Sequence, residues 1–409
     1  MHVDIVGCRS CGSAKLETVL DLGLHALADG LVYEHELDGP EAKYPLTCVV
    51  CTDCGLMQIR ENVDPEELFC NDYPYFSSFI PSLLRHSQAN VDEIIEMRGL
   101  GEGHTVFEIA SNDGYLLQYY KQRGIPVQGI DPAEGPAKAA VEKGIPTLNT
   151  FFTQELAQQL VAEGRRADVI HANNVLAHVP DLNGFVEGIA TLLAEDGIAV
   201  IECPHVLELV RHTEFDTIYH QHHCYMSATA LVPLFERHGL HLNDVRRLSI
   251  HGGSLRLFIG REPGQGETLK AVLAEEAKAK LDTPEGYREF GQRVAKLRDD
   301  LRALVLGLKE QGARIAAYGA AAKGCTMINF VGLGPDLIEY VVDRNTHKHG
   351  RYMPGEHIRI EPCERLLADR PDYTLILAWN FKDEIMEQQA EYREKGGQFI
   401  VPVPEPVIV

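Results

Sequence analysis

This sequence has no long apolar run and no signal-like N-terminus, and it has few basic residues for its number of acidic ones. No run of 18 or more apolar residues occurs among its 409 residues, which argues against a transmembrane helix. The first residues do not combine a basic region with an apolar one, so we expect no signal peptide and a cytoplasmic location. Lysine and arginine number 38 against 60 aspartates and glutamates, a net charge of -22 that disfavours nucleic acid and membrane partners. We expect a monomer or a weak homo-oligomer.

Two stretches of the chain alternate short apolar runs with amphipathic segments, a pattern typical of parallel sheets covered by helices. They extend from about residue 104 to 262 and from about 314 to 401. A charged stretch at about 267–311 predicts one or two long helices, broken near Thr283-Pro284. The fold class is therefore α/β, with domains expected at residues 1–66, 67–263 and 264–409. The predicted strands are Thr105–Ile109, Val127–Ile130, Ala167–His171, Gly197–Glu202, Leu240–Leu248, Ser254–Ile259, Arg314–Tyr318, Leu337–Val342, Tyr373–Ala378 and Gln398–Val401.

Half of the ten cysteines lie in the first 54 residues, in a pattern that suits a metal ion. Cys8 and Cys11 form one C-x-x-C pair, and Cys51 and Cys54 form another. Two thiols at this spacing can chelate one ion from a tight turn, and four thiolates are typical ligands of structural Zn²⁺. Disulfides or unpaired thiols are the alternative, which a reducing cytosol disfavours. Cys48 is a further thiol that could pack beside the site or replace Cys51.

The first strand of the middle segment leads into a turn with part of a nucleotide-binding motif. Gly114 is all that remains of a G-x-G-x-G pattern there, and Asp131 ends the next strand, where a carboxylate can accept both ribose hydroxyls of an adenosine. Glu108 and Asp113 would repel a pyrophosphate, whereas S-adenosylmethionine carries an ammonium and a sulfonium group. The charges therefore favour S-adenosylmethionine over NAD. An α/β domain that binds no nucleotide is the remaining alternative.

Polar residues follow the next strand, Ala167–His171. Asn173, Asn174 and His178 come at its carboxyl end, where ligands collect in such sheets. The asparagines could hold the donor or the substrate, although helix capping would explain them equally well.

A dense group of histidines and tyrosines occupies residues 215–225. Histidine titrates near neutral pH, so the group suits general acid–base catalysis better than metal binding. Packed or surface-exposed polar residues are the alternative explanation. His251, before two glycines, and Tyr75, in a Tyr-Pro-Tyr run, are further candidates for a site.

Taken together, these motifs resemble those of the sugar C-methyltransferases of deoxysugar biosynthesis, which act on C-3 of nucleotide-linked 4-keto-6-deoxysugars. The resemblance covers essentially the whole chain. It rests on the paired C-x-x-C, Tyr-Pro-Tyr, Glu-Ile-x-Ser-Asn-Asp-Gly, Ala-Asn-Asn-Val-Leu-Ala-His, Asp-x-Ile-Tyr-x-x-His, His-Gly-Gly and the late Tyr-Gly-Ala-x-x-Lys.

The resemblance implies a zinc-binding N-terminal domain that helps to cover the active site. It implies a Rossmann-like middle domain for S-adenosylmethionine and a smaller Rossmann-like C-terminal domain that contacts the nucleotide-diphosphate keto-sugar. In the C-terminal domain, Lys323 and the amides of the preceding turn could meet the diphosphate, with Asn329 and Asp343 nearby; a helix cap and a surface lysine are the alternative. The residues that we assign to the methyl donor are Glu108, Ser111, Asn112, Gly114, Asp131, Asn173 and Asn174.

The family's base falls on His222, with Tyr219, Tyr75 and His178 expected in the same pocket. The implied mechanism is removal of the C-3 proton, made acidic by the C-4 ketone, followed by attack of the enolate on the sulfonium methyl.

One position departs from the family pattern: many relatives have glutamate where this chain has Gln221. A neutral amide cannot pair with a cationic amino group, so we expect a substrate that bears a C-3 hydroxyl, with Gln221 and His251 among its contacts. Alternatives are a small-molecule O- or N-methyltransferase, an NAD-dependent nucleotide-sugar dehydrogenase or epimerase, and a non-catalytic sugar-nucleotide binder.

Overall fold

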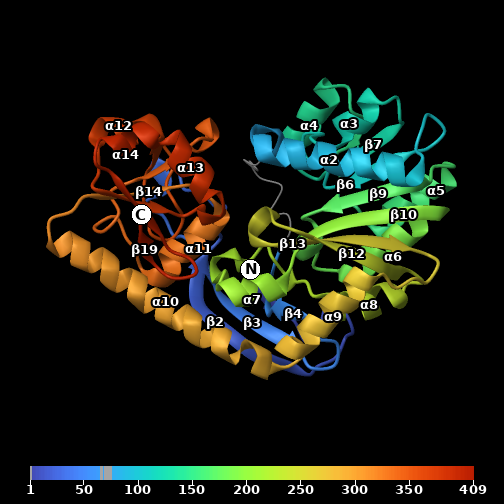
Figure 1. The fold of residues 1–409 in the computed structure, drawn as a ribbon, viewed down its shortest axis with the longest axis horizontal. Coiled ribbons are helices and arrows are strands. Elements are labelled where there is room, and N and C mark those ends of the chain that lie inside the picture. Colours follow the sequence, from blue (N-terminus) through green and yellow to red (C-terminus); the bar gives the residue numbers. More distant parts are fainter. Residues whose placement is uncertain (1, 65–67, 69–75) are drawn as a thin grey trace.

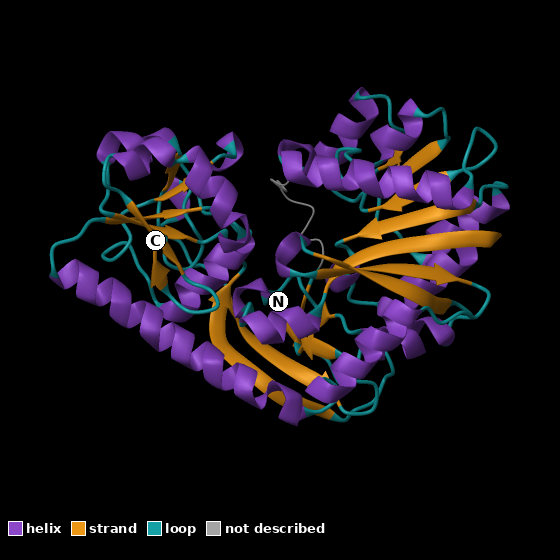
Figure 2. Ribbon diagram, in the orientation of Figure 1, coloured by secondary structure: helices purple, strands orange, loops and turns teal. Residues whose placement is uncertain are grey.

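The structure is a computed structural model that describes residues 2–64, 68 and 76–409. Three regions, each built on a sheet, follow one another along the chain (Figures 1 and 2). Within the described residues, no helix combines the length and apolarity needed to cross a membrane.

The N-terminal region is a small antiparallel sheet that borrows one strand from far along the chain. Its order is β11-β4-β3-β2, and β1 pairs separately with β5. Strand β11 is the last part of the histidine–tyrosine group, so the segment 215–225 is joined to this sheet. The strands are β1 (His2–Asp4), β2 (Leu16–Ala26), β3 (Lys43–Cys51), β4 (Met57–Ile59), β5 (Glu61–Val63) and β11 (Cys224–Tyr225).

The middle region is a seven-stranded sheet of order β12-β13-β10-β9-β6-β7-β8, covered by helices on both faces (Figure 2). Strands β8, β7, β6, β9 and β10 are parallel neighbours, and β13 runs antiparallel to both β10 and β12. The strands are β6 (Val106–Ile109), β7 (Val127–Ile130), β8 (Thr147–Leu148), β9 (Ala167–Asn173), β10 (Leu193–Pro204), β12 (His241–Leu248) and β13 (Ser254–Gly260). The helices are α2 (Pro81–Arg98), α3 (Leu117–Gln122), α4 (Glu134–Glu142), α5 (Gln154–Ala162), α6 (Leu182–Leu192), α7 (Val206–His212) and α8 (Ala228–Glu236).

The C-terminal region is a second, six-stranded sheet of order β16-β15-β14-β17-β18-β19, parallel except for β19. Its strands are β14 (Ile315–Tyr318), β15 (Val341–Asp343), β16 (Ile360–Pro362), β17 (Tyr373–Ile376), β18 (Gln398–Val401) and β19 (Val407–Ile408). Its helices are α11 (Ala322–Val331), α12 (Glu364–Asp369), α13 (Lys382–Gln388) and α14 (Ala390–Glu394).

Two helices, α9 (Glu267–Ala279) and α10 (Pro284–Glu310), connect the sheets, and the predicted break at Thr283-Pro284 separates them. Proline is tolerated at Pro284 because the first turn of a helix does not use its N–H group. The prediction of a strand at Leu337–Val342 is wrong for its first residues, which form no strand. The amides of Leu337 and Ile338 both donate to the carbonyl of Gly334, which makes a turn there and delays β15 to Val341.

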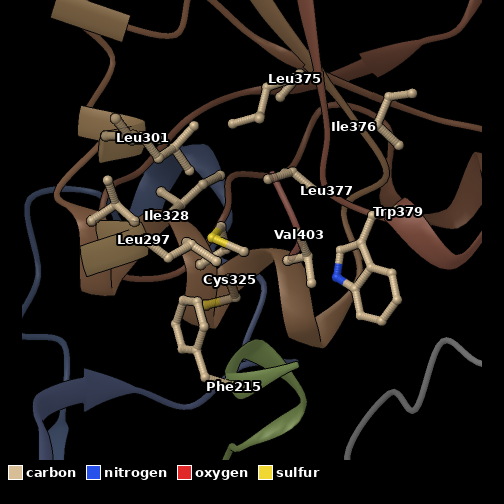
Figure 3. Close-up of a cluster of buried hydrophobic side chains, with 14 of the residues drawn as sticks. Phe215, Leu297, Leu301, Cys325, Ile328, Leu375, Ile376, Leu377, Trp379 and Val403 are labelled. Carbon is tan, nitrogen blue, oxygen red and sulfur yellow. The ribbon is translucent and has the colours of Figure 1, made fainter. Parts of the chain in front are cut away.

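One hydrophobic core extends from the N-terminal sheet along α10 into the C-terminal sheet. Helix α10 runs below both sheets (Figure 1). Phe215, from the segment before β11, reaches into this core beside Cys325 (Figure 3), and its ring lies 5.1 Å from that of Phe330. The segment 215–225 is therefore packed against the C-terminal region at its start and paired with the N-terminal sheet at its end.

Candidate active site

The four predicted zinc ligands lie together in the N-terminal region. The sulfur atoms of Cys8, Cys11, Cys51 and Cys54 are all within 4.8 Å of one another. Four thiols around one point fit a tetrahedral Zn²⁺ ion and leave no coordination position for a substrate, so the donor set suits a structural metal. Cys48 lies outside this cluster, fully buried in β3, where burial raises the pKa of its thiol well above the usual value.

Two matching turns create the cluster. Gly12 donates its amide to the carbonyl of Cys8 at 2.9 Å, and Gly55 donates to that of Cys51 at 2.8 Å. Both glycines have φ of +75°, a conformation that glycine adopts without steric cost. The side-chain amide of Gln58 donates to the Cys8 sulfur at 3.2 Å, so β4 fixes the first pair against the second.

The candidate active site is a cavity of about 1150 Å³ between the middle and C-terminal sheets. Cavities that hold one drug-sized ligand measure about 300–1,000 Å³, so this one has room for two reactants. Residues from all three regions line it, among them Asp29, Asp131, His222 and Lys323.

The middle sheet contributes acceptors at the carboxyl ends of β7 and β9. Asp131, Asn112, Asn173 and Asn174 line the cavity, as predicted for donor-binding residues. Asp131 accepts the backbone amides of Asn112 at 2.8 Å and Ala133 at 2.9 Å, and burial raises its pKa to about 6. The side-chain oxygens of Asn173 and Asn174 are buried and have no hydrogen-bond partner in the described part of the protein, which leaves them available to a ligand.

Three other predicted donor-binding residues do not line the cavity. Glu108 lies inside β6 with no exposed surface, and burial raises its pKa well above the usual value. Ser111 and Gly114 form the turn behind the cavity. A side chain at Gly114, whose φ is +76°, would meet Ile145 at 2.3 Å. These residues shape the strand end and the turn behind the cavity, and their assignment to the methyl donor stays a prediction.

Asp113 is the second acidic residue that was expected to favour a cationic ligand. Its carboxylate pairs with Lys143 at 2.9 Å and does not line the cavity. Asp131 does line it, as do Glu155 and Asp181 of the middle region.

The predicted base, His222, lies in the cavity with both ring nitrogens engaged. Nδ1 donates to the carbonyl oxygen of Thr217 at 2.7 Å, which leaves Nε2 unprotonated in the neutral ring. The hydroxyl of Tyr219 therefore donates to Nε2, at 2.9 Å. Burial and the neighbouring His178 lower the pKa of His222 well below its ordinary value. A neutral imidazole that lines a cavity can accept a proton from a bound substrate, directly or through the hydroxyl that occupies its basic nitrogen.

His178 lies beside His222, with 4.7 Å between the ring centroids. Its Nδ1 donates to the carbonyl of Gln221 at 2.8 Å, and burial lowers its pKa to about 4. The structure thus brings together three of the four predicted catalytic residues; Tyr75 lies outside the described residues. His220 and His223 are buried away from the cavity, so they make no metal site with His222.

A carboxylate that the sequence gave no reason to single out faces Gln221. The amide of Gln221 donates to Asp29 at 3.2 Å, and both residues line the cavity. Burial raises the pKa of Asp29, and Lys348 opposes this. The other side-chain atom, Oε1 of Gln221, is buried with no hydrogen-bond partner among the described residues. Asp29 follows β2, far from the motifs in sequence, and no local signal marks it.

The C-terminal sheet contributes the turn at 319–323 and the start of α11. Gly319 and Lys323 line the cavity, and Lys323 donates to the side-chain oxygen of Asn380 at 2.7 Å. Burial lowers the pKa of Lys323, whereas Asp216 and Glu214 raise it. Asp343 also lines the cavity and accepts the amide of Ala320 at 2.7 Å.

Of two further predicted substrate contacts, Asn329 and His251, one lines the cavity and the other does not. Asn329, predicted to contact the substrate, does not line the cavity; its amide donates to the carbonyls of Cys325 at 2.8 Å and Pro354 at 3.0 Å, which fixes α11 to a neighbouring loop. His251 does line the cavity, with a left-handed φ of +57°. Such backbone strain in a non-glycine residue often marks a functional site.

Comparison with known proteins assigns each region. Residues 8–69 match a family described as a zinc binding domain, residues 83–245 one described as a methyltransferase domain, and residues 249–404 one described as a C-methyltransferase C-terminal domain. The C-methyltransferase NovU of Streptomyces niveus is 36% identical over 98% of this chain and 96% of its own length.

Other similarities are partial. A ubiquinone biosynthesis O-methyltransferase of Stutzerimonas stutzeri is 32% identical over 26% of this chain and 45% of its own length. The structure of magnesium protoporphyrin IX methyltransferase from Synechocystis, with bound S-adenosylmethionine, is 16% identical, covers 43% of this chain and 79% of that one, and has a TM-score of 0.32. The full-length similarity, the three family matches and the four-cysteine cluster agree. The chain therefore belongs to the C-methyltransferases that use S-adenosylmethionine and carry a zinc-binding N-terminal domain.

Proposed function

We propose that the protein transfers the methyl group of S-adenosylmethionine to C-3 of a nucleotide-linked 4-keto-6-deoxysugar. The observation that carries this proposal is His222, a neutral base that lines the same cavity as the acceptors of the middle sheet and the lysine of α11. Carbon methylation requires a carbanion or enolate, and therefore a base that is unprotonated at neutral pH. Oxygen or nitrogen methylation of an acidic group does not.

The proposed proton transfer ends on Nε2 of His222. The C-4 ketone acidifies the C-3 proton, and the electron pair of the C–H bond moves toward the ketone oxygen as an enolate. The hydroxyl of Tyr219 occupies the Nε2 lone pair, so it must either turn aside or relay the proton; in both cases the imidazole becomes an imidazolium. When bound, S-adenosylmethionine supplies an electrophilic methyl group; C-3 bonds to it as the carbon–sulfur bond breaks.

We assign the methyl donor to Asp131, Asn112, Asn173 and Asn174, and the diphosphate to Lys323 and the amides at the start of α11. Domain limits near residues 66 and 263 remain part of this proposal, with β11 added to the N-terminal sheet. Lys323 lies in the first turn of α11 and lines the cavity, as do Arg344 and Lys348, and the dipole and N-terminal amides of that helix favour an anion.

Replacing Asp131 with alanine should weaken S-adenosylmethionine binding about 10–100-fold, because hydrogen bonds to a charged acceptor contribute about 1.5–3 kcal/mol. Titration calorimetry with the methyl donor measures this loss. Asp168→Asn is the matched control: Asp168 also accepts a backbone amide, that of Thr105, but lies at the amino end of β9. Equal affinity in the wild-type protein and D131A would remove Asp131 from the donor site.

The C-3 substituent is expected to be a hydroxyl, because the unpartnered Oε1 of Gln221 can accept a hydroxyl proton. Gln221→Glu should shift the ratio of kcat/KM values toward the 3-amino sugar by about tenfold or more, since a carboxylate favours an ammonium group. Asp29→Asn serves as the comparison, because it removes the neighbouring charge without changing residue 221. A wild-type enzyme that strongly prefers the 3-amino substrate would contradict the hydroxyl assignment.

The function itself is tested with a panel of nucleotide-linked 4-keto-6-deoxysugars. We expect methylation at C-3 by NMR and, in D₂O without methyl donor, loss of the C-3 proton signal that depends on His222. Exchange or methylation at C-5, the other carbon beside the ketone, would contradict the position. Methylation on oxygen or nitrogen without exchange would contradict the carbanion mechanism. Binding of NAD but not of the methyl donor would contradict the whole assignment.

A further inference from the structure

The segment before β11 is fastened alternately to the C-terminal region and to the base. The carboxylate of Asp216 accepts the indole N–H of Trp379 at 2.7 Å. The next residue, Thr217, accepts Nδ1–H of His222 at 2.7 Å. The carbonyl of Ile218 then accepts the hydroxyl of Thr326, on α11, at 3.0 Å. The two contacts with the C-terminal region thus flank the carbonyl that orients the base.

Trp379 takes part in a second contact, on the cavity side. The ammonium of Lys323 lies 4.6 Å from the centre of its ring, within the range of a cation–π interaction. The same lysine donates to Asn380, the residue after Trp379. One indole therefore touches the proposed diphosphate-binding cation with its face and the segment of the base with its N–H group.

Burial of the Asp216 carboxylate is energetically unfavourable. Its side chain has no exposed surface, and burial raises its pKa to about 6, while Lys323 and the Trp379 hydrogen bond oppose that rise. A buried carboxylate is costly unless it is paired and hydrogen-bonded. An asparagine could accept the same indole proton, so the charge points to electrostatic coupling with Lys323 rather than to packing alone.

We propose that the Asp216–Trp379 hydrogen bond is a positioning contact that links occupancy of the nucleotide-sugar site at Lys323 to the orientation of His222. The inference rests on the proposed function for the identity of the ligand, but not for the link itself. A diphosphate that draws Lys323 away from the ring and from Asp216 changes the charge around both Trp379 and Asp216. Thr217, which lies between Asp216 and Ile218, transmits this change to His222.

The test compares Trp379→Phe, which keeps a ring but removes the N–H group, with Asp216→Ala and Asp216→Asn. We expect kcat to fall about tenfold or more in W379F and D216A with little change in KM for the methyl donor, and the double variant to be no worse than either single one, because they remove the same contact. D216N should recover part of the rate, since its amide oxygen still accepts the indole proton. Tyr392→Phe is the matched control: it removes a buried hydrogen bond to Pro371 in the same region, away from the cavity.

An NMR measurement of binding, which needs no catalysis, tests this link independently of the proposed methyl transfer. In protein labelled with ¹⁵N-histidine, the Nδ1–H signal of His222 should shift when uridine or thymidine diphosphate is added, and the shift should be lost in W379F and in Lys323→Met. Loss of the shift in both variants would support the link even before the sugar substrate is identified. No shift with either nucleotide in the wild-type protein, or variants that lower only the melting temperature as Y392F does, would overturn it.

Discussion

Replacing His222 with asparagine should lower kcat for methyl transfer by about 10²–10⁴-fold, the range expected when a general base is removed. The loss follows from the chemistry of Nε2, because asparagine has no basic nitrogen. The amide of asparagine is small enough for the half-buried site and can still donate toward Thr217, so the fold should be retained. Steady-state rates and the rate of C-3 proton exchange in D₂O should fall together.

The control for this variant is His238→Asn. His238 hydrogen-bonds to Asn183 at 3.0 Å and lies outside the cavity, so its loss should leave kcat within about twofold. If H222N exchanged the proton at the wild-type rate but failed to methylate, His222 would act on the methyl-transfer step and another group would be the base.

The pH dependence of the wild-type enzyme also tests His222 as the base. A base works when it is unprotonated, and burial lowers the pKa of His222 well below its ordinary value of 6.5. The acid limb of kcat/KM should therefore lie below pH 6.5, with no loss of activity between pH 7 and 8 from this group. A limb above pH 7 would contradict the half-buried, neutral imidazole.

Replacing Cys11 with serine should remove stoichiometric zinc and lower the first thermal unfolding transition by about 10 °C or more. Structural zinc contributes about 10–16 kcal/mol of apparent binding free energy in small domains, and that energy supports folding of the region that holds it. Metal analysis and calorimetry measure the two losses. Cys48→Ala is the matched control, because Cys48 is buried in the same sheet but lies outside the four-sulfur cluster.

Activity should fall with the metal, even though none of the four zinc-site cysteines lines the cavity. Strand β4 pairs with β11, whose first residue, Cys224, comes two positions after His222. A disordered zinc region would release this strand and with it one end of the base-bearing segment. If C11S retained full kcat after losing its zinc, the N-terminal sheet would be dispensable for positioning the base.

The sequence predicted best what short-range patterns control. The paired C-x-x-C spacing specified the four ligands because each pair is made within one turn. The short strands β6, β7 and β18 were predicted nearly to the residue, because strand-like runs that alternate with amphipathic helical segments indicate a parallel sheet. His222 came from a family motif rather than from periodicity.

Contacts between distant residues could not be predicted in this way. Gln221 and Asp29 are 192 positions apart, and Trp379 and Asp216 are 163 apart, so no spacing rule connects them. Glu108 was assigned to the donor because it precedes a nucleotide-type turn. The structure buries Glu108 completely within β6, and the local sequence pattern did not predict this burial. Asn329 was likewise assigned from its nearness to Lys323, whereas its amide faces a loop.

The pairing of β4 with β11 also sets the order in which the chain can fold. Met57 pairs with Tyr225, so the sheet that starts the chain cannot be completed until more than half of the protein has been synthesised. The zinc ligands, by contrast, are all available by residue 54. During translation the metal can therefore bind and order the first strands early. The edge of β4 stays unpaired until the segment that carries the base has been synthesised. Formation of the active site is thereby tied to arrival of the last strand of the first domain.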